Sequence, residues 1–287
     1  MKIVSYNIQY GLGADGRFDL KRIAGELDGA DVIGLQEVER FWTRSGMVDQ
    51  PAELAGFLGD YHWVYGANLD VDASYREDGK LVNRRRQFGT MVLSKPPILS
   101  SRNFPLPKRA LIDQHSIQQG LLETVIAPTD GAPFRFYCVH LSHLCPETRL
   151  PQIDVILDVL QRGPEEGGAW CGGHPDPDAG WTEGGPYPMP DPLILAGDLN
   201  FEPDSAEYDR FLGPLAPEHG RLYSQTGLVD AWDVAGNGRT DATTHPNHEA
   251  RIDHIFLSAS LAPTVGRCWV DETATGSDHL PLWLEMT

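Results

Sequence analysis

The chain has 287 residues, of which 41% are hydrophobic and 22% are charged, so it is long enough to bury a substantial core. Acidic residues outnumber basic residues by 41 to 23, and a formal net charge of −18 disfavours an extended phosphate backbone as a ligand. No apolar stretch of about 18 residues occurs, so the sequence predicts no membrane-spanning helix.

The four cysteines lie far apart and form no C-x-x-C pair, which indicates free thiols rather than a zinc knuckle or a disulfide framework. The first predicted strand begins at Lys2 and leaves no room for a signal peptide, so we expect a cytoplasmic protein. The acidic surplus is compatible with divalent-cation binding, although most such charge is ordinary solvated surface.

Residues 2–8 are rich in β-branched residues and predict a strand that ends at the polar Asn7. The following segment, residues 11–16, matches the dinucleotide-binding pattern G-x-G-x-x-G, with Glu37 about 20 residues further on. A nucleotide-binding fold would continue with helix-linked parallel strands, whereas the later strands of this chain are hairpin-like neighbours. We therefore disfavour the dinucleotide interpretation.

Asp19 is predicted to cap a helix that runs to about Asp28, and Asp49 marks the start of a second helix. Between them, the apolar run 31–36 predicts a short strand with Glu37 at its terminus, where a carboxylate is well placed to face a cleft. The alternative is a solvated loop glutamate.

The densest positive spot is Arg84-Arg85-Arg86, which follows a polar loop and enters a predicted strand at residues 88–94. Forked guanidinium donors suit a substrate phosphate, so these three arginines are candidate phosphate ligands. The alternative is a solvated loop in which they pair with Glu77 and Asp78.

Residues 118–127 and 133–140 predict two strands joined by the turn Pro128-Thr129-Asp130-Gly131, hence an antiparallel hairpin. His140 ends the second strand. H-x-x-H spacing relates His140 to His143 and also His245 to His248, but neither pair lies on a credible helix with a third ligand, so zinc is not the favoured interpretation.

A helix is predicted over 148–160, and the segment 163–192 that follows is rich in Gly and Pro. Long irregular loops inside a compact domain are often functional lids, and the aromatic residues Trp170, Trp181 and Tyr187 favour a packed lid here. No domain boundary is placed at this insert, so we expect residues 1–287 to form one domain.

The next strand, residues 193–198, is the most apolar one, and it runs into Gly197-Asp198-Leu199-Asn200. Residues i and i+2 of an extended chain share a face, so Asp198 and Asn200 are predicted to stand side by side and to hold water and phosphate oxygens. The alternative is a simple turn.

A short helix is predicted from Asp204 or Ser205 to Leu212. Strands are predicted at 251–257, 265–270 and 282–286, with Asp253 buried in the first of them and in need of a partner. Polar residues thus recur at strand ends along the chain, and they are of the types that one hydrolytic site needs: Asn7, Glu37, His140, Asp198, Asn200, Asp253, Asp278 and His279.

On these motifs the sequence resembles the endonuclease/exonuclease/phosphatase superfamily, which has the deoxyribonuclease-I-like fold. The resemblance covers nearly the whole chain through segments 5–8, 35–38, 88–94, 139–141, 197–200, 251–255 and 277–279. It implies an α/β fold, a four-layer α/β/β/α sandwich of two packed mixed β-sheets flanked by helices. It also implies a hydrolase that uses Mg²⁺ or Mn²⁺ to cleave phosphoesters, as nucleases, sphingomyelinases and inositol-polyphosphate phosphatases do.

The resemblance implies a role for each motif residue. Glu37 would be the principal metal ligand, with Asn7 and Asp278 completing or supporting the site. His279 and Asp253 would be a proton-transfer pair, and either Asp198 or His279 would take the proton of the water. Asp198 and Asn200 would position that water and the phosphoryl oxygens, and His140 would donate to the scissile phosphate.

The chain differs from many nucleases of the superfamily in its strongly acidic composition and in its Gly/Pro-rich segment 163–192. We therefore expect a small or lipid-derived organic phosphoester as the substrate. A nuclease acting on DNA or RNA is the alternative. A catalytically inactive binding protein is disfavoured, because none of the eight polar positions is missing. The sequence does not predict monoester or diester specificity, or the oligomeric state.

Overall fold

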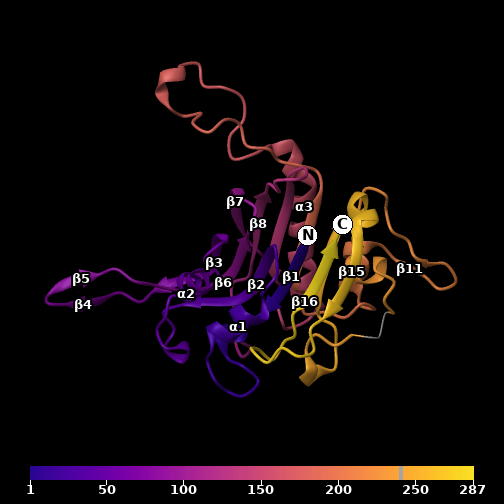
Figure 1. The fold of residues 1–287 in the computed structure, drawn as a ribbon. Coiled ribbons are helices and arrows are strands. Elements are labelled where there is room, and N and C mark those ends of the chain that lie inside the picture. The colour runs from indigo at the N-terminus through magenta and orange to yellow at the C-terminus, as the bar shows by residue number, and fades with distance from the viewer. Residues whose placement is uncertain (239–241) are drawn as a thin grey trace.

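The computed structural model describes residues 1–238 and 242–287, which contain two six-stranded sheets packed face to face (Figure 1). The first sheet has the order β15 (Val265–Val270), β16 (Leu282–Met286), β1 (Lys2–Asn7), β2 (Val32–Arg40), β6 (Arg85–Ser94) and β3 (His62–Asp72). The second has the order β13 (Leu228–Asp230), β14 (Asp253–Ser258), β10 (Leu193–Asp198), β9 (Phe134–His140), β8 (Gly120–Ile126) and β7 (Ile98–Pro105).

Both sheets are mixed, as predicted, because each contains one parallel pair among antiparallel ones. Strand β1 runs parallel to β2, and β9 runs parallel to β10. The predicted hairpin is confirmed by the antiparallel pairing of β8 with β9.

The main core lies between the sheets and is formed by inward-facing apolar residues of both, such as Ile3, Phe136 and Ile255. Burial of side chains of this size stabilises the fold by roughly 1.5–3 kcal/mol each. At Gly34 the sheets approach so closely that an added Cβ would lie 3.2 Å from the ring of Phe136. A larger residue at this position would require the Phe136 ring to shift.

Helices cover the outer faces and complete the four-layer sandwich predicted from the sequence. Helices α1 (Leu20–Glu26) and α2 (Gln50–Phe57) pack on the first sheet, and α3 (Pro146–Glu166) and α4 (Ala206–Leu212) pack on the second. The side chains of Asp19, Asp49 and Ser205 accept hydrogen bonds from the first turns of α1, α2 and α4. These predicted helix starts are confirmed, whereas α3 extends six residues beyond the predicted end at Leu160.

Shorter elements complete the described residues. Strands β4 (Tyr75–Glu77) and β5 (Lys80–Val82) form a projecting hairpin where a polar loop was predicted, β11 (Leu215–Ala216) pairs with β12 (Gly220–Arg221), and α5 spans Ala231–Val234. Single 3₁₀ turns occur at Gln9–Gly11, Thr43–Ser45, Pro177–Ala179, Pro246–His248 and Ala259–Thr264. The glycine pattern at 11–16 starts no helix, which agrees with the rejection of a dinucleotide site.

The sequence predicted a strand that ends at Gln36, with Glu37 at its terminus. Strand β2 instead continues through Glu37 to Arg40 and contains a bulge. Leu35 pairs with Met91 and Val38 with Gly89, so two residues of β2 face a single residue of β6. The extra residue gives Glu37 a φ of +60° and turns its side chain out of the normal alternation. The bulge therefore aims the carboxylate in a way that a regular strand could not.

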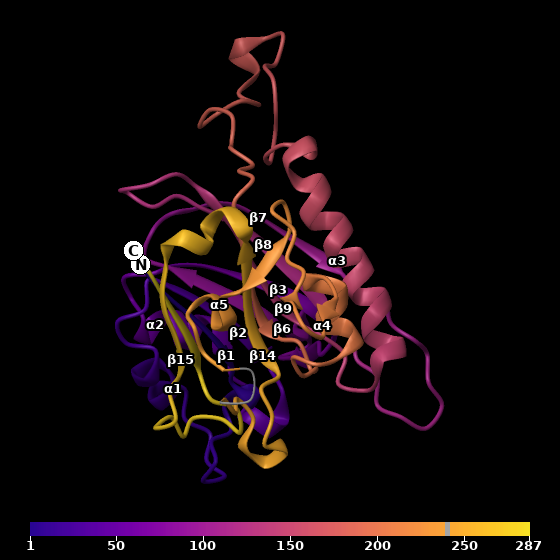
Figure 2. The same ribbon diagram turned by 90° about the vertical axis from the view of Figure 1, so that its right-hand side faces the viewer.

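The Gly/Pro-rich segment, residues 167–192, projects beyond the end of α3 and away from both sheets (Figures 1 and 2). In both views it lies at the end of the sandwich opposite the loop that follows β1. No helix among the described residues is long and apolar enough to cross a membrane.

Candidate active site

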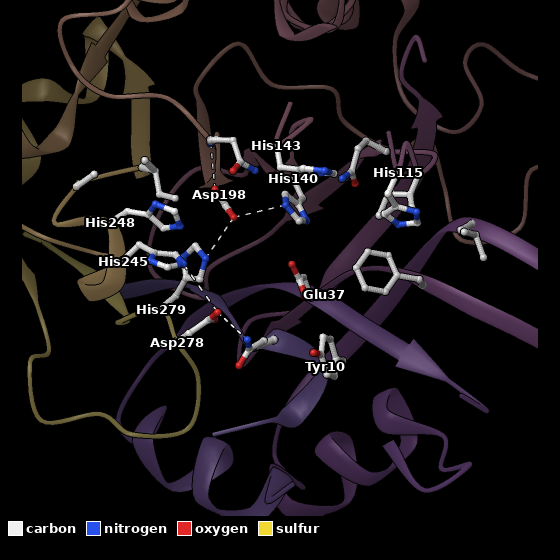
Figure 3. A pocket seen from close by; sticks show the side chains of 18 of the residues that line it. Tyr10, Glu37, His115, His140, His143, Asp198, His245, His248, Asp278 and His279 are labelled. Carbon is white, nitrogen blue, oxygen red and sulfur yellow. Dashed lines mark hydrogen bonds and ion pairs between the residues drawn. The ribbon is translucent and has the colours of Figure 1, made fainter. Parts of the chain in front are cut away.

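A cavity of about 690 Å³ opens at the end of the sandwich where β1, β9 and β10 have their last residues (Figure 3). Six of the eight polar residues predicted from strand ends line it: Glu37, His140, Asp198, Asn200, Asp278 and His279. The other two, Asn7 and Asp253, bond to lining residues. The structure therefore brings all eight together.

Asp198 lies at the centre of this cluster because strand register aligns it with residues on both sides. It is paired with His140 across the parallel β9 and with Asp253 across the antiparallel β14. Its Oδ2 accepts a hydrogen bond from Asn7 Nδ2 (2.9 Å) and lies 3.4 Å from His140 Nε2 and 3.6 Å from His279 Nε2. Burial alone would raise the pKa of Asp198, but the two histidines hold it below its usual value.

Asp253 supplies the predicted partner of His279. The Nδ1 of His279 donates to Asp253 Oδ2 over 2.8 Å, and both side chains are buried. Burial lowers the pKa of His279, but the carboxylates of Asp253 and Asp198 outweigh this effect and raise the pKa to about 10. A ring with this pKa carries protons on both nitrogens, so Nδ1 donates to Asp253 and the protonated Nε2 faces Asp198 Oδ2, 3.6 Å away.

Glu37 extends from the bulge in β2 to the middle of the cavity (Figure 3). Its Oε1 accepts a hydrogen bond from Asn7 Nδ2 (3.3 Å), and burial raises the pKa of its carboxyl group. A half-buried carboxylate in such desolvating surroundings is costly, and a bound cation would remove that cost.

Several oxygen donors accompany Glu37, as a hard divalent cation requires. Asp278 lines the same cavity and accepts a hydrogen bond from Gln9 Nε2 (2.6 Å). Ligand atoms lie within 4.8 Å of one another in two sets, His245 with Asp278 and His279, and Asp198 with Asp253 and His279. Neither set includes Glu37, but the carboxylate oxygens of Glu37 and Asp278 are of the kind that Mg²⁺ and Mn²⁺ prefer.

Asn7 has a different orientation from that of a simple metal ligand. Its Oδ1 accepts a hydrogen bond from the backbone N of Gln9 (3.0 Å), while its Nδ2 donates to Glu37 and Asp198. In this arrangement Asn7 holds the two carboxylates in place.

Asn200 is not extended, so the predicted alternation with Asp198 is wrong. Its φ is +56°, its backbone N donates to Asp198 Oδ1 (3.0 Å), and its Nδ2 donates to the carbonyl of Leu141 (3.0 Å). The chain turns after Asp198 and still places both side chains in the cavity wall.

The structure does not bring the three predicted phosphate-binding arginines into the cavity. Arg85 Nε donates to Asp70, Arg86 Nε donates to the carbonyl of Phe41, and the Arg84 guanidinium lies 4.3 Å from the ring centre of Tyr75. They lie at the far end of the β3–β6 ribbon, whose pairing continues to Asp72 and Arg85 beyond the cavity. The sequence could not show that β3 extends this far.

Arg44, which the sequence analysis missed, lines the cavity instead. Its Nε and Nη2 donate to the buried Glu39 Oε2 over 3.1 and 2.8 Å, and its guanidinium lies 3.9 Å from the ring centre of Tyr10. A single arginine in a polar loop gives no sequence signal of this kind.

Four further histidines line the cavity: His115, His143, His245 and His248. The ring centre of His245 lies 4.3 Å from that of His248 and 4.5 Å from that of His279, whereas His115 lies across the cavity beyond Glu37 (Figure 3). The H-x-x-H spacing was a signal for these residues, but it did not reveal that both pairs converge on one cavity. Burial lowers the pKa of His143 and of His245.

The predicted lid is wrong. The insert projects from the end of the sandwich that is opposite the cavity (Figures 1 and 2). None of its three aromatic residues, Trp170, Trp181 and Tyr187, lines the cavity. Trp181 is 75% exposed, and Trp170 packs edge-on against Tyr187. The insert leaves α3 after Glu166 and enters β10 at Leu193, both at the end of the sandwich opposite the cavity.

A family model described as the Endonuclease/Exonuclease/phosphatase family matches residues 4–279. No curated protein sequence matches the chain. Among solved structures, an endonuclease/exonuclease/phosphatase from Beutenbergia cavernae is similar, with 22% identity over 99% of this chain and 70% of that chain and a TM-score of 0.62. A mannosyl-6-phosphatase from Bacteroides thetaiotaomicron has 18% identity over 100% and 99% of the two chains, with a TM-score of 0.60. The human Nocturnin catalytic domain has 19% identity over 100% and 94%, with a TM-score of 0.61.

Proposed function

Because this chain belongs to the endonuclease/exonuclease/phosphatase family, whose members hydrolyse phosphoester bonds, we propose that it uses a divalent metal ion to hydrolyse a small organic phosphoester. The observation that carries the proposal is the convergence of Asn7, Glu37, His140, Asp198 and His279 on one cavity from both sheets.

Glu37 and Asp278 would hold the metal ion, with Asn7 fixing the Glu37 carboxylate. The ion would supply positive charge to a phosphoryl oxygen and lower the pKa of a bound water. Mg²⁺ and Mn²⁺ are the ions that suit such carboxylate oxygens.

The remaining residues would orient and move protons. Asp198 and Asn200 would position the attacking water, and His140 would donate a hydrogen bond to the phosphate. Asp198 Oδ2 lies 3.6 Å from His279 Nε2. Because its raised pKa keeps the His279 ring protonated, Asp198 would take the proton that the water gives up. Asp253 would hold the His279 ring in the orientation that this transfer needs.

Size and charge favour a small substrate over a nucleic acid. A volume of about 690 Å³ is in the range of small-molecule pockets. Within residues 1–238 and 242–287, Arg44 is the only lysine or arginine in the cavity wall, and Glu39 already binds its guanidinium. A nucleic acid strand would instead need several free cations.

The test is a screen with Mg²⁺ or Mn²⁺ against phosphomonoesters, phosphodiesters, phospholipid head groups, DNA and RNA. We expect turnover of a small or lipid-derived phosphoester that chelation abolishes. Faster cleavage of DNA, with a steep loss of rate as salt increases, would favour the nuclease alternative and overturn the substrate proposal.

A further inference from the structure

Gln119 lines the cavity with a buried side chain whose polar atoms are unused. The residue is 1% exposed, and neither Oε1 nor Nε2 of its amide has a hydrogen-bond partner among the described residues. The amide of its neighbour Gln118, by contrast, donates to the carbonyl oxygens of Leu106 (2.6 Å) and Gln119 (2.8 Å). Buried polar groups are almost always bonded, so the Gln119 amide is a site for an incoming group.

The chemistry of an amide indicates which group that is. A carboxamide offers one acceptor and two donors side by side, whereas the oxygens of an ionised phosphate can only accept hydrogen bonds. A phosphate would leave the Gln119 oxygen unbonded. Neighbouring hydroxyl groups both donate and accept, so they can satisfy the oxygen and the nitrogen of the amide together.

The cavity that Gln119 lines also has apolar and aromatic residues in its wall. Ile117 precedes it in the loop between β7 and β8, and Trp42, Leu69 and Phe88 line the same cavity. Flat apolar surfaces of this kind pack against the C–H face of a saturated ring, while a few polar groups fix the orientation of the ring.

The contacts of Arg44 disfavour two other kinds of alcohol. A second phosphate would need a free cation, but Arg44 is held by two hydrogen bonds to Glu39. A quaternary ammonium group would need open aromatic faces, but the Arg44 guanidinium already lies over Tyr10 and at 4.8 Å from the ring centre of Trp42.

We propose that Gln119 binds hydroxyl groups of the substrate, and that the substrate is a phosphate ester of a neutral polyhydroxylated ring, a sugar or a cyclitol. This inference rests on the proposed hydrolysis at the phosphate end of the cavity. Gln119 acts on the alcohol portion and takes no part in bond cleavage.

The experiment compares kcat/KM for mannose 6-phosphate, glucose 6-phosphate, glucose 1-phosphate and myo-inositol 1-phosphate with kcat/KM for phenyl phosphate, AMP and phosphocholine. We expect a sugar or cyclitol phosphate to be the best substrate. Gln119→Leu should reduce kcat/KM for that substrate about 10- to 100-fold more than for phenyl phosphate, because it removes hydrogen bonds to hydroxyls that phenyl phosphate lacks.

Gln118→Leu is the matched control, because it makes the same change one residue away at an amide that bonds only to backbone. It should lower the melting temperature and leave the ratio of the two kcat/KM values unchanged. Gln119→Leu should leave the melting temperature unchanged or raise it. An equal loss on every substrate, or a wild-type preference for phenyl phosphate, AMP or phosphocholine, would overturn the inference.

Binding of free mannose, glucose and myo-inositol, measured by saturation-transfer NMR, separates this inference from the proposed function. We expect wild type and Glu37→Gln to bind at least one of them and Gln119→Leu to bind it much more weakly. Binding without any hydrolysis would contradict the proposed function alone. Hydrolysis of phosphoesters without a contribution from Gln119 would contradict this inference alone.

Discussion

The two ends of the sandwich differ in how their polar and aromatic residues are used. At the cavity end, Asn7, Asp198 and His279 are buried and contact one another at a meeting point of both sheets. At the opposite end, the insert carries Trp181 on its surface and makes its aromatic contact within itself, between Trp170 and Tyr187. Polar residues at strand ends therefore identified the cavity, whereas aromatic composition in a loop did not indicate where the loop lies.

The largest effect is expected from Glu37→Gln at the cavity end. Loss of the principal carboxylate for the metal ion should reduce kcat by about 10³-fold, the rate equivalent of about 4 kcal/mol. The melting temperature of the metal-free protein should not fall, because burial already raises the pKa of this carboxyl group. Isothermal titration with Mn²⁺ should show weaker binding, and unchanged binding with unchanged kcat would contradict the metal assignment.

The second prediction concerns His279 and Asp253, which we expect to act as a unit. Each single change to Ala should reduce kcat by about 10²- to 10⁴-fold, and the double variant should be little worse than the slower single variant. Steady-state kinetics of the three variants, with circular dichroism as a check on folding, measures the coupling. Multiplicative losses would show two independent roles.

A third test addresses the body of the protein between the two ends. Asp230 is buried and paired with Arg251 over 2.9 Å, and Asp230→Asn should destabilise the fold by about 3–5 kcal/mol because Arg251 would lose its partner. Burial raises the pKa of Asp230, but Arg251 and His254 hold it well below the usual value. The stabilisation is thus present above pH 4 and is lost as the pH falls.

Urea unfolding of wild type and Asp230→Asn at pH 7 and pH 3 checks this linkage. The difference in unfolding free energy should narrow at the lower pH, because the Asp230 carboxylate of the unfolded wild type takes up its proton near the ordinary pKa while the folded protein keeps it ionised. A difference that is constant with pH would indicate lost packing rather than a lost ion pair.

A smaller effect is expected at Arg84, Arg85 and Arg86, which lie outside the cavity. Changing all three to Gln should alter kcat/KM for a small phosphoester by no more than about threefold, since exposed pairs such as Arg85 with Asp70 contribute little. The triple variant is compared with Arg44→Gln, which changes an arginine inside the cavity. A loss of kcat/KM greater than tenfold in the triple variant would show that these arginines take part in substrate binding.

The smallest effect is expected from shortening the insert. Gly168 and Tyr187 approach so closely that an added Cβ on Gly168 would lie 2.0 Å from the Tyr187 carbonyl oxygen, so a short Gly/Ser linker can join the two sides there. Replacement of residues 169–187 should leave kcat/KM unchanged. A substantial loss of activity would mean that the insert influences the cavity from the opposite end.

Much of the fold was predictable because its signals are local. Caps at Asp19, Asp49 and Ser205 and apolar runs such as 193–198 depend on a few consecutive residues. The presence of polar residues at strand ends likewise predicted that they would meet, because strand ends of two packed sheets share an edge.

What the sequence did not predict depends on pairing between distant segments. The bulge at Glu37 exists only relative to β6, and the turn at Asn200 depends on the carbonyl of Leu141. Arg44 is held in the cavity wall by its hydrogen bonds to Glu39, and Gln119 lies at the end of the β7–β8 loop. No local sequence pattern predicts either placement. The direction of the insert is likewise not encoded in its own composition, because none of residues 167–192 lines the cavity.

Glu37 holds a left-handed backbone conformation that costs a non-glycine residue about 1–3 kcal/mol. Glycine at this position would relieve the strain, and any uncharged residue would remove the burial of a carboxylate. A directed-evolution screen that selects only for heat resistance would therefore enrich substitutions at residue 37 that abolish hydrolysis. Engineering this protein for thermostability thus requires that activity be measured in every round or that residue 37 be left out of the library.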